Sequence, residues 1–440
     1  MNDNLIIAGI ADAPYPKLHT GFAQVSGQIY DGFYKAGFNL YTFGILDWTP
    51  DMDKVLPYPF WPTSPFDPMG NQEMITFVQQ VKPDIVWIMI DPGNLLKYAI
   101  NLIELNNDLV KNGQKGFKIL AYPPIEGKPL SMFQATAIKH IMQNDGNVVF
   151  WCESAAREAE KWLPEWNFDY IYFGNDHLDA RMYTPSERKL LRQKVGIDDF
   201  FMITSIGVNK RTKGFPTLIY TATYLKEWGY EDKIKFYCHT DPLNPTMQGH
   251  HLVDIADRYG VKKMFLWKPD SQRRGNPYVG SERSNGTYEK VAYTKKPRTS
   301  KGRQKLWETY DFTSRLDCMD LYVDVSQTEG QGMPSLEAMA RGIPLISVHD
   351  GHVRDELYGN IAYMIDPLPP HLWETWHTGA RLVSIDPIKV AEAIVEMVEN
   401  EQLREDVKKR GLERTATMKW ADTQAAMVEK VRELHARSTG

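Results

Sequence analysis

Short apolar runs alternate with amphipathic stretches along the whole chain, and this rhythm constrains the fold more than any other feature. The runs are hydrophobic throughout, which is typical of parallel strands covered on both faces. Helical patterns lie between most of them, so βαβ units in two doubly wound α/β sheets are predicted. The expected strands are Leu5–Ile10, Leu40–Phe43, Asp84–Ile90, Phe117–Tyr122, Val148–Trp151, Tyr170–Phe173, Phe201–Ile206, Ile234–Cys238, Met264–Trp267, Leu321–Val325, Pro344–Val348 and Ala362–Ile365.

The two sets of strands predict two Rossmann-like domains and a C-terminal tail. We expect a first domain over 1–195, a second over 196–415 with an insertion at 268–305, and a last helix in 416–440 that packs back on the first domain. Asp386 before Pro387 predicts one helix cap, and Asp422 predicts a cap for the last helix. Ligands of open α/β sheets bind beyond the carboxyl ends of strands, so we expect the site in a cleft between the two sheets.

Composition excludes several other classes. The formal net charge of the 440 residues is −5, so the chain as a whole is no general polyanion binder. Three cysteines without a CxxC pair exclude a disulfide framework or zinc ribbon. No apolar run approaches the roughly 20 residues that span a bilayer, and the N-terminal residues lack the charge of a secretory signal. A cytoplasmic protein is expected, in the host cell if the source is viral.

The segment Leu321–Pro344 carries the most chemical information. It predicts a buried strand, a loop in which Gly330 and Gly332 allow close backbone approach, and a helix. Free amides and a helix N-terminus at a sheet edge would stabilise a diphosphate. Glu329 and Glu337 stand beside this anion site, and because carboxylates repel phosphate we expect them to accept hydrogen bonds from hydroxyls. A ligand with both phosphates and hydroxyls is a nucleotide sugar.

Two further turns contribute to the expected site. Gly207–Phe215 places Lys210, Arg211 and Lys213 at a strand end before a helix. Fixed cations there would stabilise the charge that develops on a leaving nucleoside diphosphate. The first strand-to-helix turn, Pro16–Ala23, contains Gly21 and His19.

These motifs resemble those of the retaining glycosyltransferases of family 4, which have the GT-B fold. The stretch EGQGMPSLEAMARGIP at Glu329–Pro344 is similar to the family's paired-glutamate signature, and Gly207–Gly214 is similar to its phosphate motif. Gly174–Asp176 and Tyr183–Pro185 resemble the family's interdomain segment. Ala121–Leu130 and Cys238–Thr240 resemble a subgroup common in phages and prokaryotes. The family usually has arginine where this chain has Val208, and Arg211 is the expected substitute.

The resemblance implies sugar transfer from a UDP- or GDP-linked donor with retention, without a metal or other cofactor. Glu329, Lys213 and Arg211 would be catalytic. The acceptor side would include Glu126, His19 and Asp176. The donor-binding residues would be Glu337, Gly21, Gly207, Gly330, Gln331, Gly332, Met333, His239, Trp267 and Lys268.

Several alternatives stay open. His349, Asp350, His352 and Asp355 could hold a metal, although a polar loop facing the cleft is favoured. The segment 268–305 has eleven Lys and Arg against three acids, with interspersed tyrosines. It is either a solvated insertion or an arm for DNA, as in phage enzymes that glycosylate modified bases. A nucleotide-sugar epimerase and a non-catalytic binding protein are the other candidate classes.

Overall fold

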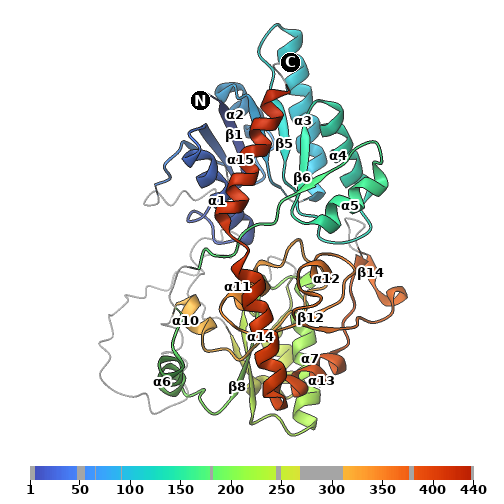
Figure 1. Ribbon diagram of the computed structural model, residues 1–440. Helices are drawn as coiled ribbons and strands as arrows, with labels where there is room; N and C mark the ends of the chain where they lie inside the picture. Colours follow the sequence, from blue (N-terminus) through green and yellow to red (C-terminus); the bar gives the residue numbers. More distant parts are fainter. Residues whose placement is uncertain are drawn as a thin grey trace.

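The computed structural model describes residues 5–46, 55–64, 66–90, 92–178, 182–243, 249–267, 311–375 and 381–437. They form two α/β lobes, stacked one above the other in Figure 1, and each is built on a parallel sheet. The twelve predicted strands are confirmed, with ends that differ by a few residues. The predicted fold class, α/β with two Rossmann-like domains and C-terminal helices, is therefore confirmed.

The first sheet has the order β3-β2-β1-β4-β5-β6-β7, with parallel pairing throughout. Its fully buried strands, such as β4 with Ile85, Val86, Trp87 and Ile88, explain the uninterrupted apolar runs. The strands are β1 Ile6–Asp12, β2 Asn39–Ile45, β3 Phe60–Pro62, β4 Ile85–Ile88, β5 Lys118–Ala121, β6 Asn147–Phe150 and β7 Asp169–Tyr170. The helices of this part are α1 Gly21–Lys35, α2 Glu73–Val81, α3 Pro92–Lys111, α4 Met132–Gln143 and α5 Glu153–Trp162.

The second sheet has the order β10-β9-β8-β11-β12-β13 and is also parallel. Its strands are β8 Phe201–Ile206, β9 Ile234–His239, β10 Phe265–Trp267, β11 Leu321–Val323, β12 Leu345–Val348 and β13 Tyr363–Ile365. The helices that follow or cover them are α6 Pro185–Val195, α7 Phe215–Glu227, α8 Leu252–Arg258, α10 Phe312–Leu316, α11 Met333–Ala340, α12 Val353–Tyr358, α13 Pro387–Glu399 and α14 Glu401–Ala416.

Helix α6 contacts the second lobe, although it lies within the predicted first domain. Arg188 donates from Nε to the Asp317 carbonyl oxygen (2.8 Å), and Arg192 donates from Nη1 to Asp320 Oδ2 (2.8 Å). These charge-assisted bonds attach the segment between the sheets to the second lobe.

The last helix, α15 (Trp420–Ala436), lies against α1 of the first lobe, as the red ribbon in Figure 1 shows. Gln424 of α15 donates from Nε2 to the Gln28 carbonyl oxygen (2.8 Å). Asp386 caps α13 as predicted, with its side chain accepting from the Ile388 amide. The prediction for Asp422 is wrong: α15 begins at Trp420, so Asp422 lies inside the first turn.

Two short elements were not expected from the sequence. Strand β3 adds to the edge of the first sheet from a segment rich in proline and aromatic residues. An antiparallel pair, β14 (Glu374–Thr375) and β15 (Arg381–Leu382), follows β13 and contains too few residues for a readable pattern.

Polar contacts join the lobes at several points. Glu356 of α12 accepts from the amides of Glu153 and Ser154 at the N-terminus of α5 (2.9 and 2.6 Å). A carboxylate is stabilised there by the free amides of the first helical turn. Gln331 contacts both the amide and the carbonyl of Phe173 (3.0 Å each). Such reciprocal bonds fix the two lobes in one relative arrangement.

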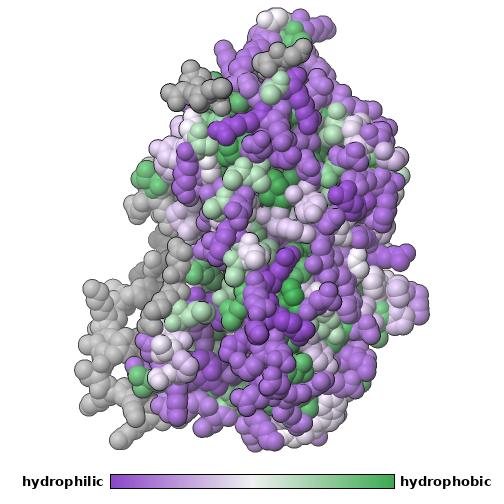
Figure 2. Space-filling view, in the orientation of Figure 1, coloured by the Kyte–Doolittle hydropathy of each residue, from purple (hydrophilic) through white to green (hydrophobic). Residues whose placement is uncertain are grey.

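The face seen in Figure 2 is mostly hydrophilic, with hydrophobic residues in small groups among the hydrophilic ones. Within the described ranges, no helix is both long and apolar enough to cross a bilayer.

Candidate active site

The predicted donor loops meet where the strand order of the second sheet reverses. Strand β8 lies between β9 and β11, so the chain leaves β8 toward one edge and returns to β11 on its other side. The loops after β8 and β11 are joined by a hydrogen bond from the Gln327 amide to the Thr212 carbonyl oxygen (2.7 Å). Such a reversal opens a crevice beyond the carboxyl ends of the strands, where ligands of open α/β sheets bind.

Glycines at two positions let these loops approach one another. Gly214 has φ of +62°, and a Cβ there would overlap the Val325 carbonyl oxygen. Gly207 lies against the aliphatic part of the Lys213 side chain, whose Cγ and Cδ are 3.5 Å from the position that a Cβ would take on Gly207. The phosphate motif therefore turns tightly and directs the lysine toward the loop after β11.

Lys213 and Glu329 form an ion pair at this crevice, which is the juxtaposition that the sequence predicted. Their side chains are 20% and 12% exposed. Burial alone would lower the pKa of Lys213 and raise that of Glu329, but the attraction between the two charges outweighs it. The pKa of the lysine is therefore raised, that of the glutamate is lowered, and both are charged at neutral pH.

A second carboxylate lies beneath the pair. Asp324 is 4% exposed, and burial raises its pKa against the attraction of Arg354. Arg354 is fully buried and donates from Nε to Asp350 Oδ2 (2.9 Å) and from Nη1 to the Ser326 carbonyl oxygen (2.6 Å). These contacts of Arg354 fix the loop after β11, which carries Glu329.

The glycine loop after β11 leaves backbone donors available. Gly332 has φ of +77° and precedes α11, and a Cβ at Gly330 would contact Pro124 and Trp151 of the first lobe. Among the described residues, no group accepts from the amides of Gln331, Gly332 and Met333. These amides at a helix N-terminus can bind an anion. The Gln331 side chain itself is committed to Phe173.

Glu337 on α11 is held by a residue that sequence reasoning did not assign. His177 contacts Glu337 Oε1 through Nε2 (2.7 Å), and the Trp420 indole donates to His177 Nδ1 (3.2 Å). An acceptor at Nδ1 assigns the proton to Nε2, so the histidine donates to the carboxylate. His177 directly follows the Gly174–Asp176 motif, but nothing in the pattern distinguishes it from a surface histidine.

His239 and Trp267 end β9 and β10, on the other side of the crevice. The His239 ring contacts the Tyr237 hydroxyl through Nδ1 (2.8 Å) and packs against Phe312, with 4.9 Å between centroids. Trp267 stacks on Phe265 at 5.2 Å. Lys268, the insertion 268–305 and its proposed DNA contacts lie outside the described residues.

The first lobe contributes the start of α1. Gly21 is its first residue, and no atom lies within 4 Å of a Cβ built there, so space is open beside the helix N-terminus. Thr20 caps the helix by accepting from the Ala23 amide (3.0 Å). His19 is exposed and packs edge-on against Tyr15 (5.3 Å).

Two predicted site residues lie elsewhere. Arg211 pairs with Glu374 of β14, with both side chains about half exposed, rather than joining Lys213. The one-turn helix Arg211–Lys213 turns the two side chains apart. Asp176 accepts from the Trp420 amide (2.8 Å) and so caps α15 instead of facing the crevice.

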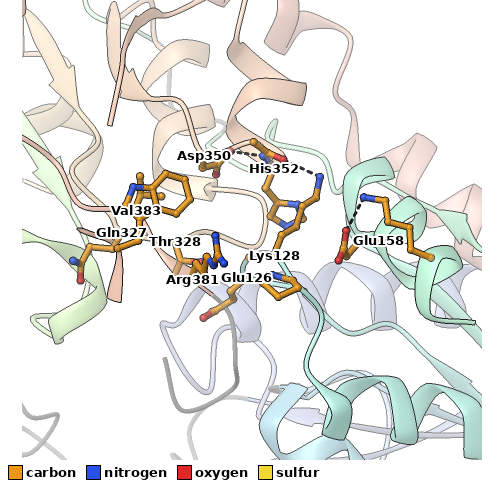
Figure 3. A pocket seen from close by; sticks show the side chains of 14 residues that line it. Glu126, Lys128, Glu158, Gln327, Thr328, Asp350, His352, Arg381 and Val383 are labelled. Carbon is orange, nitrogen blue, oxygen red and sulfur yellow. Dashed lines mark hydrogen bonds and ion pairs between the residues drawn. The ribbon is translucent and has the colours of Figure 1, made fainter. Parts of the chain in front are cut away.

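A cavity of about 370 Å³ lies between the lobes next to this site (Figure 3). Thr328, directly before Glu329, lines it, and so does Glu126, which the sequence analysis assigned to the acceptor side. Sequence reasoning missed five of the lining residues, because they come from segments that carry no motif: Glu158, Lys161, Trp373, Arg381 and Val383. The others are Gly127, Lys128, Pro129, Gln327, Thr328, Asp350, Gly351 and His352.

The polar loop after β12 does face the cleft, as the favoured alternative expected. His352 contacts the Ile125 carbonyl oxygen through Nε2 (2.7 Å) and Ser154 through Nδ1 (2.9 Å). His349 pairs with Asp355, and Asp350 with Arg354. No group of three metal-ligating side chains is found in the part of the chain that the structure describes.

This architecture, with two Rossmann-like lobes and the crevice between them, is the predicted GT-B fold, as comparison with solved structures shows. The sucrose-phosphate synthase of Thermosynechococcus elongatus matches it with a TM-score of 0.63 and 15% identity, over 98% of this chain and 100% of that one. A glycosyltransferase of Rickettsia africae has a TM-score of 0.66 and 12% identity, over 98% and 99%. Anabaena HepE in complex with UDP-glucose has a TM-score of 0.62 and 12% identity, over 98% and 100%.

At these identities the comparisons show the fold. No protein-family model matches the sequence, and a search of the curated proteins found no match. The activity is therefore argued from the site.

Proposed function

We propose that this protein is a retaining glycosyltransferase, similar to family 4, that moves a sugar from a nucleoside diphosphate sugar to an acceptor hydroxyl. One observation carries the proposal: Lys213 and Glu329 meet at the strand-order reversal of the second sheet, beside loop amides that no other described group accepts from. A cation with free amides suits the diphosphate, and a carboxylate beside them suits the sugar hydroxyls.

The donor would extend along the crevice of the second lobe. Lys213 and the amides of Gln331 to Met333 would hold the diphosphate, and Glu329 would accept from hydroxyls of the transferred sugar. Glu337, positioned by His177, would hold the ribose through its other oxygen. The nucleobase, uracil or guanine, would lie toward His239 and Trp267, and the open space beside Gly21 would face the phosphates. That HepE is described with UDP-glucose supports this class of donor.

The reaction would be a front-face substitution. The acceptor oxygen forms its bond to the anomeric carbon as the bond from that carbon to the diphosphate oxygen breaks, and the acceptor proton passes to the leaving phosphate. Negative charge grows on the diphosphate in the transition state. Lys213 and the loop amides stabilise that charge more than they stabilise the ground state, which accelerates transfer. The same groups supply positive charge without a bridging metal.

The acceptor would approach from the first lobe, toward Glu126. The Glu126 carboxylate is near enough to Lys213 for its charge to contribute to the raised pKa of the lysine. DNA as acceptor depends on the insertion 268–305 and remains a prediction from the sequence.

The first experiment measures melting temperature against UDP, GDP and sugar-linked forms of each, because a ligand that binds only the folded state raises it. We expect one nucleotide series to raise the melting temperature, and Lys213→Ala to abolish most of the shift. Lys226→Ala is the control, since Lys226 is exposed on α7, where it donates to the Gly260 carbonyl oxygen (2.8 Å) and lies 3.8 Å from Glu231. Equal shifts in both variants, or none with any nucleotide, would contradict the donor assignment.

A further inference from the structure

Two passages of the chain between the lobes lie against each other beside helix α11. The first is the segment 173–177, and the second, 418–420, joins α14 to α15. The Trp420 amide donates to Asp176 Oδ1 (2.8 Å). A Cβ on Gly174 would lie 2.2 Å from the Trp420 backbone nitrogen, so this approach requires glycine. The backbone of Trp420 is therefore fixed relative to the first passage.

The side chain of Trp420 is fixed as well. Trp420 is 4% exposed, and its ring stacks on that of Phe173, with 5.8 Å between centroids and an interplanar angle of 10°. Its indole N–H donates to His177 Nδ1 (3.2 Å). Because both the ring and its one polar atom are held, the N–H keeps a fixed direction toward the histidine.

The indole determines which nitrogen of His177 carries the proton. An indole has one N–H donor and no acceptor, so Nδ1 must accept and the proton lies on Nε2. A proton on Nδ1 would face the indole N–H and is excluded. His177 Nε2 is 2.7 Å from Glu337 Oε1, so the neutral histidine donates to the carboxylate.

This hydrogen bond orients Glu337. The side chains of His177 and Glu337 are 7% and 10% exposed, so water competes little for it. Among the described groups none donates to Glu337 Oε2. Because the histidine is neutral, the carboxylate also keeps its full charge, and an anionic oxygen accepts the stronger hydrogen bonds.

We infer that Trp420 is a positioning residue of the donor site, which fixes the proton and the orientation of His177 and through them the carboxylate of Glu337. The inference rests on the proposed function, which gives Glu337 the ribose hydroxyls. Without the indole, Nδ1 can take up a proton. The histidine then either turns the Nε2 lone pair toward Glu337 or becomes a cation that neutralises it, and both weaken the bonds from ribose. A site on the second lobe thus depends on the first residue of α15, which lies on the first lobe.

Calorimetric titration of the full chain tests the inference. The probes are inorganic pyrophosphate, UDP and 2′,3′-dideoxy-UDP, which lacks both ribose hydroxyls; the guanosine pair replaces the last two if GDP is the nucleotide that binds. The parent should bind UDP about tenfold or more tighter than the dideoxy form, the scale of a lost hydrogen bond to a charged group. Trp420→Phe keeps an aromatic ring beside Phe173 and removes the N–H. It should lower that preference by about fivefold or more and leave the affinities for the other two probes within about twofold of the parent.

Nitrogen-15 NMR of histidine-labelled protein near neutral pH reads the proton directly. The His177 signals, identified by their absence in His177→Phe, should show the proton on Nε2 alone in the parent and a partly protonated Nδ1 in Trp420→Phe. A merely structural role for Trp420 would not move this proton. The matched control is Trp228→Phe, which changes a tryptophan at the end of α7 that is 42% exposed and should behave as the parent in both measurements.

Three results would overturn the inference. They are a parental preference for UDP in Trp420→Phe, an equal loss of affinity for all three probes in that variant, and a parent with the His177 proton on Nδ1. Failure of the proposed function is read separately, in the parent. A parent that binds no nucleotide contradicts the donor assignment, and one that binds UDP and the dideoxy form equally contradicts the ribose role of Glu337 and the inference with it.

Discussion

Replacing Lys213 by alanine separates the contribution of the lysine to stability from its proposed role in transfer. The substitution leaves Glu329, 12% exposed, without its counter-ion and next to Asp324. Breaking a fully buried pair costs about 3–5 kcal/mol. The Lys213 side chain is 20% exposed, so water can solvate part of the charge left on Glu329. We therefore expect the free energy of unfolding to fall by about 2 kcal/mol. For a lobe of this size, that is a melting temperature lower by roughly 4–8 °C.

A second variant tests the cause of that loss. Lys213→Ala/Glu329→Gln removes both charges, so the uncompensated carboxylate disappears and at least half of the lost melting temperature should return. Transfer should not return, since loss of one preorganised charge partner costs about 10²–10³-fold in rate. Both are measured against the parent and Glu405→Gln, an exposed carboxylate on α14. Transfer by Lys213→Ala within threefold of the parent, or a double variant no more stable than the single one, would refute the reasoning.

Three further outcomes are expected. Gly214→Ala should destabilise the protein more than Gly229→Ala. Both glycines have positive φ, which alone costs alanine about 1–2 kcal/mol, but only at Gly214 would a Cβ also overlap another group, the Val325 carbonyl. Equal melting temperatures of the two variants would contradict this prediction. Burial lowers the pKa of His352 against the attraction of Asp350, so below pH 6.5 the unfolded chain binds a proton that the folded chain does not, and stability falls as the pH drops below that value. His352→Gln should weaken this loss in melting scans between pH 7.5 and 5.5, and parallel profiles would show that the histidine is not its source. Transfer should proceed at an unchanged rate with excess chelator, and inactivation that added metal reverses would exclude the metal-free step.

The sequence predicts the local motifs of the candidate site better than the contacts that their side chains make. The positions of Lys213, Glu329 and the glycines between them follow from local rules, because a strand, a tight turn and a helix N-terminus are encoded within a few consecutive residues. Arg211 shows the limit of such rules: it is two residues from Lys213, yet its guanidinium pairs with Glu374, 163 residues further along. Asp176 is a second example: a motif predicted it on the acceptor side, but its carboxylate accepts from the Trp420 amide at the start of α15.

What the sequence alone determined is the class of fold and the glycine-containing loops after β8 and β11, since apolar periodicity and turn residues act over short distances along the chain. Only the tertiary structure decided which groups meet across the lobes: His177 on Glu337, His352 on Ile125, and Lys128 with Arg381 around one cavity. Such contacts depend on how the two sheets pack, and because no local pattern encodes that packing, the residues of the cavity between the lobes could be assembled only in three dimensions.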